Sequence, residues 1–212
     1  MNYQDYKDAR DASWRILIDC EVTELPVRIS GVCRALGVSV RRYTPAERDS
    51  NDGMSTVIGG APTIMVSNLT IPARQRFTCA HELGHIILGH VGRYDLVCRE
   101  PDPGDNPIEQ AANVFASRLL APACVLWGCG VRSAEDIERL CDISRAAAEF
   151  RWSRMQELYR RQRFQSGDLF VAQIFFDETA VAAGDFHDVS AVGRLGRCLR
   201  IIAVTIWVGK FV

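Results

Sequence analysis

The chain has 212 residues, a formal net charge of −1, and 48% hydrophobic and 24% charged residues. These values are typical of a globular protein with one domain, or with one domain and an appendage. The near-neutral charge excludes a strong overall attraction to nucleic acid or to a membrane surface, and the polar residues 1–8 do not form a secretory signal. We therefore expect a cytoplasmic protein whose eight scattered cysteines are reduced thiols.

The first third of the chain predicts two helices followed by three strands. Apolar residues recur at near-helical spacing over residues 4–22, and a second helix over 27–36 should end at Gly37, which suits the position after a helix. Alternating polarity and turn residues predict the elements that follow, namely a strand over 38–43, a loop over 44–55, and strands over 56–58 and 63–66 joined by Gly59-Gly60.

The next segment contains the motif H-E-x-x-H at residues 81–85. On a helix, residues i and i+4 share a face, so His81 and His85 can bind one metal ion. Glu82 follows the first of these ligands and can reach a water on the ion. This is the arrangement of a zinc hydrolase that cuts amide bonds.

An apolar stripe supports the helical interpretation of this motif. Apolar positions fall within about 100° of one another on a helical wheel, with both histidines at the edge of the stripe; they are Phe77, Ala80, Gly84, Ile87 and Leu88. Pro72 suits the first turn of the helix, and Thr70 is a candidate cap before it. The alternative is a surface helix with two incidental histidines.

A second helix, predicted over residues 108–120 and capped by Asp105 or Asn106, offers a third metal ligand. A catalytic zinc usually has three protein ligands and a water. Glu109 lies in the middle of the apolar face of this helix, where a carboxylate is costly unless a cation pairs with it. Asn113, one turn later, can hydrogen-bond to a ligand from outside the metal shell. The alternative for Glu109 is a first-turn acid that is favoured by the helix dipole.

Other candidate ligands have weaker support. His90 is nine residues beyond His81, so a continuous helix would place it on the opposite face. His187 is distant in sequence and is interpreted as a surface histidine. A second metal site would need ligands whose spacing matches no common zinc site, namely Cys124, Cys129, Cys141 and His187.

Two sequence blocks resemble the ImmA/IrrE family of metallo-endopeptidases. Residues 74–85 match the pattern R-Q-R-F-T-x-A-H-E-L-G-H, and residues 109–122 match E-x-x-A-N-x-F-A-x-x-L-L-x-P nearly position for position. The second block is characteristic of the family in a way that H-E-x-x-H alone is not. The resemblance extends over about residues 25–160.

The resemblance implies an α+β fold, a mainly helical, gluzincin-like zincin domain with a small β-sheet. This domain would cover residues 1–165, including a C-terminal helical segment over 131–165, and would leave 166–212 as a tail of unassigned role. Zn²⁺ would be held by His81, His85 and Glu109, with Glu82 catalytic. Described substrates of the family are helix-turn-helix repressors of phages, mobile elements and stress regulons, so site-specific cleavage of such a repressor is the implied function.

Three further expectations concern the surroundings of the site. Tyr94 and Arg118 are candidate donors to the oxyanion. A substrate strand could pair with a sheet edge near Thr63–Ser67. The alternative function is a DNA-binding or regulatory protein without proteolysis, which would use a helix-turn-helix-like unit over residues 134–159. The near-neutral charge argues against direct nucleic-acid binding, so we favour a helical hairpin there.

Overall fold

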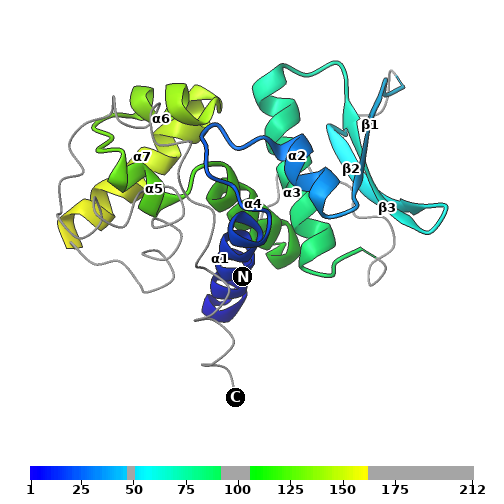
Figure 1. The fold of residues 1–212 in the computed structure, drawn as a ribbon, viewed down its shortest axis with the longest axis horizontal. Coiled ribbons are helices and arrows are strands. Elements are labelled where there is room, and N and C mark those ends of the chain that lie inside the picture. The colour runs from blue at the N-terminus through cyan, green and yellow to red at the C-terminus, as the bar shows by residue number, and fades with distance from the viewer. Residues whose placement is uncertain (47–50, 92–105, 162–212) are drawn as a thin grey trace.

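A computed structural model describes residues 1–46, 51–91 and 106–161 (Figure 1). The elements in chain order are α1 (Tyr3–Asp19), α2 (Ile29–Ala35), β1 (Ser39–Tyr43), β2 (Gly53–Ile58), β3 (Ala61–Ser67), α3 (Pro72–Ile87), α4 (Pro107–Leu120), α5 (Ala123–Gly128), α6 (Ala134–Cys141) and α7 (Arg145–Arg161). The described part is mainly helical with one small sheet, which confirms the predicted α+β class.

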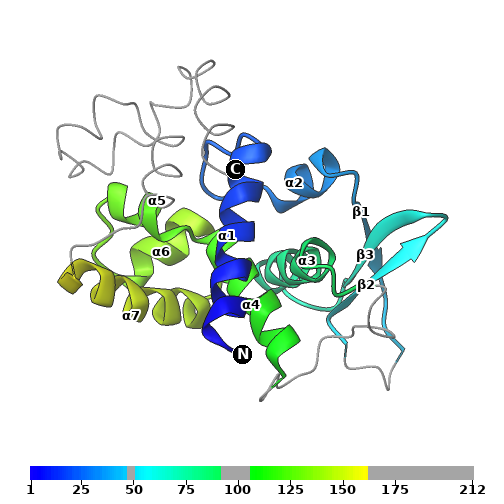
Figure 2. The ribbon, with the colours of Figure 1, turned by 90° about the horizontal axis from the view of Figure 1, so that it is seen from below.

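The described elements form three groups in a row (Figures 1 and 2). The sheet lies at one end and α5, α6 and α7 lie at the other, with α1, α3 and α4 between them. The core is continuous through these groups, because fully buried side chains come from each of them, including Leu17, Ile64, Leu83, Phe115 and Ile137. The centre of the molecule is therefore the packed pair of α3 and α4, which carries both predicted ligand blocks.

The three strands of the described sheet are ordered β1-β3-β2. β3 pairs with β1 in parallel, with Ser39 opposite Thr63, and with β2 in antiparallel, with Gly53 opposite Val66. The segment Thr63–Ser67 is therefore interior to the sheet, and the prediction of a substrate-binding edge there is wrong. The edge strand next to α3 is β2, which begins at Gly53, inside the region predicted as a loop.

A close approach between α3 and α4 depends on Gly84. A Cβ atom at this position would lie 3.0 Å from Cδ1 and 3.3 Å from Cβ of Phe115. Since Phe115 is fully buried, its ring has little room to move away. The glycine inside the H-E-x-x-H motif thus sets the spacing between the two ligand-bearing helices.

Local signals explain where most helices begin. The Asn2 side chain accepts a hydrogen bond from the backbone N–H of Asp5 and forms a capping box at the start of α1. Asn106, one of the two predicted caps, accepts from Ile108 N at 3.0 Å at the start of α4. Thr70 does not cap α3, because its hydroxyl donates to the Ser67 carbonyl at 3.4 Å. Helix α3 begins two residues later, at Pro72, and its N-cap residue Ile71 makes no side-chain cap.

Helix bounds differ from the sequence predictions in two places. α1 ends at Asp19, three residues before the predicted end, because the chain turns at Glu21, where φ is 48°. α5 was not predicted, since its six residues are too few to show helical periodicity.

The continuous stretch Pro107–Gly128 is long and apolar enough to span a membrane, but 67% of that window is buried inside the protein, as expected of core helices.

The predicted C-terminal helical segment is present as α6 and α7. The Arg76 guanidinium of α3 donates to the backbone carbonyl of Asp142 at 2.7 Å, forms an ion pair with its carboxylate, and donates to the Val27 carbonyl at 3.1 Å. Tyr159 OH donates to the Val131 carbonyl at 2.9 Å.

The domain boundary predicted at residue 165 lies outside the described residues, as does the tail 166–212, so this division stays a prediction.

Candidate metal centre

Three buried side chains from α3 and α4 converge at one point. Nε2 of His81 lies 3.0 Å from Nε2 of His85, and the two oxygens of the Glu109 carboxylate lie 3.1 Å and 3.2 Å from these nitrogens. Both histidines are 0% exposed and Glu109 is 2% exposed. Burial alone would raise the pKa of Glu109, but its hydrogen bonds and charge interactions with the histidines lower it to about 2, so the carboxylate is ionised.

This donor set fits a zinc ion. The nitrogen and oxygen atoms all lie within 4.8 Å of one another, and two histidines with one carboxylate form a common set of ligands for catalytic zinc. Metal–ligand bonds of about 2.0–2.1 Å in a tetrahedron put neighbouring donors about 3.4 Å apart, close to the observed spacings. No other group of three possible ligands occurs among the described residues. Cys124, Cys129 and Cys141 are buried thiols that form no three-ligand group among the described residues. His187 lies outside the described residues.

The outward nitrogen of each histidine also has a partner. Oδ1 of Asn113 lies 3.0 Å from Nδ1 of His81, as the sequence predicted. Nδ1 of His90 lies 3.0 Å from Nδ1 of His85, which the sequence did not predict. A histidine that binds metal through Nε2 carries its proton on Nδ1, so Asn113 and His90 can each accept that proton in a hydrogen bond and fix the ring.

The position of His90 corrects the helical-wheel prediction. That prediction assumed that the helix continues to residue 90, whereas α3 ends at Ile87. Gly89 adopts a φ of 70°, which favours glycine, and the chain turns back so that His90 N donates to the His85 carbonyl at 2.8 Å. His90 therefore lies beside His85 and not on the opposite face of the helix.

We expect His90→Ala to weaken zinc binding about 10–100-fold, the usual effect of removing an outer hydrogen-bond partner. His90→Asn should restore most of the affinity, because its Oδ1 occupies nearly the place of the histidine Nδ1. The measurement is competition between the metal-free protein and a chromogenic chelator for Zn²⁺. Equal affinity of the wild type and His90→Ala would show that His90 does not position His85.

The general-base candidate, Glu82, is fully buried next to strand β2. The hydroxyl of Ser55 donates to Oε2 of Glu82 at 2.8 Å. A Cβ atom at Gly53 would clash with Cγ2 of Thr78 and would lie 2.9 Å from the Met65 carbonyl oxygen. Strand β2 can therefore approach α3 and Glu82 this closely because residue 53 has no side chain. Ser55 was not predicted as a site residue, because it lies in the region 44–55 that was predicted as a loop.

Of the two candidate oxyanion donors, Tyr94 lies outside the described residues. Arg118 is nine residues after Glu109 on α4, about 13 Å along the helix axis. Its guanidinium donates to the hydroxyl of Tyr6 on α1 and lies over that ring, 5.6 Å from the centroid. This contact holds Arg118 in the wall between α1 and α4, and not at the metal ligands.

Comparison with known proteins places this geometry in a family. The family model for the IrrE N-terminal-like domain, a peptidase family, matches residues 33–161, which include all of β1 to α7. The chain belongs to the IrrE N-terminal-like peptidase family. Membership confirms the predicted ImmA/IrrE resemblance and, at the level of the family, the predicted enzyme class of metallo-endopeptidase.

Two curated relatives of this family share moderate identity with the chain. The radiation response metalloprotease IrrE of Deinococcus radiodurans is 37% identical over 91 residues, which are 41% of this chain and 25% of that protein. The protein of the same name from Deinococcus deserti is 33% identical over 96 residues, 40% of this chain and 34% of that protein. The matched region thus spans a quarter to a third of the length of these relatives.

Proposed function

We propose that the chain is a zinc-dependent endopeptidase, with His81, His85 and Glu109 as metal ligands and Glu82 as the catalytic base. The observation that carries this proposal is the convergence of the three ligands in one buried cluster, with Glu82 directly after the first of them. A metal-binding cluster alone would also suit a structural site. A structural zinc, however, usually has four protein ligands, whereas three leave a position for water.

The chain's own part in the chemistry lies at Glu82. Zinc, when bound, would polarise the scissile carbonyl and lower the pKa of a water molecule towards neutrality. The carboxylate of Glu82 accepts the proton of the attacking water and then passes it to the leaving amine. The hydrogen bond from Ser55 to Oε2 restrains this carboxylate beside β2.

The proposed substrate is a helix-turn-helix transcriptional regulator, cut at one site in the cytoplasm. The support is the two sequence blocks shared with the ImmA/IrrE family, whose described substrates are repressors of phages, mobile elements and stress regulons. Two matched relatives are themselves named radiation response metalloproteases. Specific cleavage of a regulator would couple a stress signal to transcription without direct binding of this chain to DNA.

The test is incubation of the purified zinc-loaded chain with the helix-turn-helix regulator encoded next to it. Mass spectrometry should show two complementary fragments from a single peptide bond, and a chelator should prevent their formation. An unrelated helix-turn-helix protein is the matched control and should remain intact. An uncut regulator, in an assay where a denatured general substrate is cut, would contradict the proposed substrate but not the peptidase activity.

The alternative of a DNA-binding unit is not favoured by the surface of α6 and α7. Arg145 pairs with Glu138 at 3.4 Å and with Glu149 at 2.9 Å, and Arg160 forms an ion pair with Glu157. Charges paired within the chain neutralise fewer phosphates. Arg151, another arginine of α7, is buried and is not placed on the outer surface where a DNA backbone would lie. These contacts fit a helical hairpin that packs on the peptidase core.

A further inference from the structure

A cavity of about 480 Å³ lies between α1, α4 and α7, beside the metal centre. Phe77 and Asn113 form its wall on the side of the metal ligands, and Asn113 is the residue that contacts His81 Nδ1 at 3.0 Å. Most of the remaining lining is apolar, from Val114, Leu120, Ile143, Ala147 and Phe150. The proposed catalytic chemistry makes no use of this space.

Among the described residues, three arginines line the cavity and no aspartate or glutamate does. The arginines are Arg118, Arg151 and Arg154. None of the three forms a salt bridge with a carboxylate of the described residues. Arg118 interacts with Tyr6, and Arg154 lies over the Phe150 ring at 5.6 Å from its centroid. The cavity therefore combines apolar walls with a local excess of positive charge.

Arg151 is the decisive residue of this cluster. It is 4% exposed, and its Nε donates to the Ala121 carbonyl at 2.7 Å. Its Nη2 is buried and has no hydrogen-bond partner among the described residues. Burial, together with the charge of Arg118, lowers the pKa of the guanidinium to about 9, so it stays charged at neutral pH. A buried cation with an unpaired N–H group is costly, and an anion can remove that cost.

We propose that this cavity binds a carboxylate attached to an apolar body, with the guanidinium groups of Arg151 and Arg118 supplying the positive charge that attracts it. A guanidinium matches the geometry of a carboxylate, and the apolar walls match an aliphatic or aromatic remainder. A phosphate fits less well, because the cavity presents few polar groups for its additional oxygens. The carboxylate could belong to an acidic side chain of the peptide substrate or to a free small molecule.

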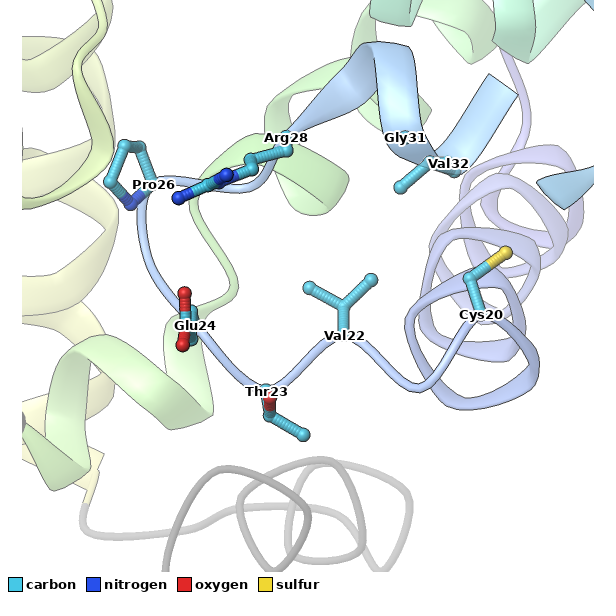
Figure 3. A pocket seen from close by; sticks show the side chains of 8 residues that line it. All are labelled: Cys20, Val22, Thr23, Glu24, Pro26, Arg28, Gly31 and Val32. Carbon is cyan, nitrogen blue, oxygen red and sulfur yellow. The ribbon is translucent and has the colours of Figure 1, made fainter. Parts of the chain in front are cut away.

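A second hollow among the described residues lacks this excess of positive charge. It has a volume of about 210 Å³ and lies between the end of α1 and the start of α2. Figure 3 shows that its lining contains the carboxylate of Glu24 as well as the guanidinium of Arg28. Opposite charges are both present there, and no buried polar atom of its lining lacks a partner. Of these two hollows, only the cavity at Arg151 has a buried cationic group with an unpaired N–H in its lining.

The first experiment measures binding of phenylacetate and of the uncharged phenylacetamide to the metal-free full chain by ligand-observed NMR. Removing the metal prevents phenylacetate from binding at the zinc. We expect phenylacetate to bind about tenfold or more tightly than phenylacetamide, which is the effect of one charge-assisted hydrogen bond. Arg151→Met should abolish this difference. The matched control is Arg160→Met, a substitution of an exposed arginine on the same helix, which should preserve it.

If Arg151→Met does not fold, Arg118→Met provides the same test at the wall of the cavity and should reduce the preference several-fold. Equal binding of the two probes to the wild type, or a preference that survives in both variants, would overturn the proposal. These measurements need no proteolysis, so they can succeed even if the proposed endopeptidase activity is wrong.

A second experiment separates the two sources of the carboxylate. Phenylacetate is added to the cleavage reaction, and acidic residues beside the cut bond of the regulator are changed to their amides. If the carboxylate comes from a substrate side chain, phenylacetate should inhibit cleavage competitively. The substrates whose acidic residues were changed to amides should then have a raised KM, and this difference in KM should disappear in the Arg118→Met enzyme. A free small molecule as the source predicts binding without either effect. Both outcomes support the carboxylate site, and absence of phenylacetate binding overturns it.

Discussion

Replacing Glu82 by glutamine is expected to reduce peptide cleavage about 10²–10⁴-fold, because the variant loses the general base. The substitution keeps the size of the side chain and the hydrogen-bond acceptor for Ser55. Glu82 is not a member of the three-residue cluster, so zinc content should remain unchanged. The measurements are kcat on the regulator and metal content by atomic absorption, made on the same preparation.

The matched control for this variant is Glu135→Gln, the same chemical change at an exposed position in the first turn of α6. It should cleave at the wild-type rate. Retained cleavage in Glu82→Gln would contradict the assignment of the base. Loss of zinc in that variant would instead make Glu82 a determinant of metal binding, and the cluster of three ligands would be incomplete.

Replacing Phe115 by alanine is expected to lower the free energy of unfolding by about 3–5 kcal/mol, a large part of the 5–15 kcal/mol of a typical domain. The ring is 0% exposed and packs against Gly84, between the two helices that carry the metal ligands. Its removal leaves a cavity at that contact. Urea denaturation of the metal-free protein measures the effect without a contribution from bound zinc.

The control for packing is Tyr3→Ala, an aromatic residue of α1 that is 72% exposed. Its effect should stay within about 0.5 kcal/mol, as is usual for surface substitutions. If Phe115→Ala were as mild as Tyr3→Ala, the contact between α3 and α4 would not depend on this ring. We also expect Phe115→Ala to bind zinc more weakly at temperatures where it begins to unfold.

The sequence predicted the parts of the site that follow from helical periodicity and from the two family blocks. His81 and His85 share a face because they are one turn apart, and the apolar face of the second helix pointed to Glu109 and Asn113. The structure brings these four side chains together as expected. Their roles in binding zinc stay predictions for the experiments above.

The parts that were missed depend on contacts between distant segments or on where an element stops. Ser55 contacts Glu82, which is 27 residues later in the sequence. The polar residues before Ser55 predicted a loop, whereas β2 already begins at Gly53. His90 was misplaced because periodicity shows that a helix exists but not where it ends, and here Gly89 ends the turn. Neither residue leaves a periodic trace that a single sequence could reveal.

The Arg76 side chain contacts one segment that precedes α3 in the sequence and one that follows it. Its guanidinium reaches the backbone of residue 27, before α2, and the turn at Asp142 between α6 and α7, where φ is 50°. One side chain thus connects the turn between α6 and α7 to the helix that carries both histidines. Arg76 lies only five residues before His81, the first of the proposed metal ligands. Helices α6 and α7 therefore cover the core and are also connected, through Arg76, to the helix that carries His81 and His85.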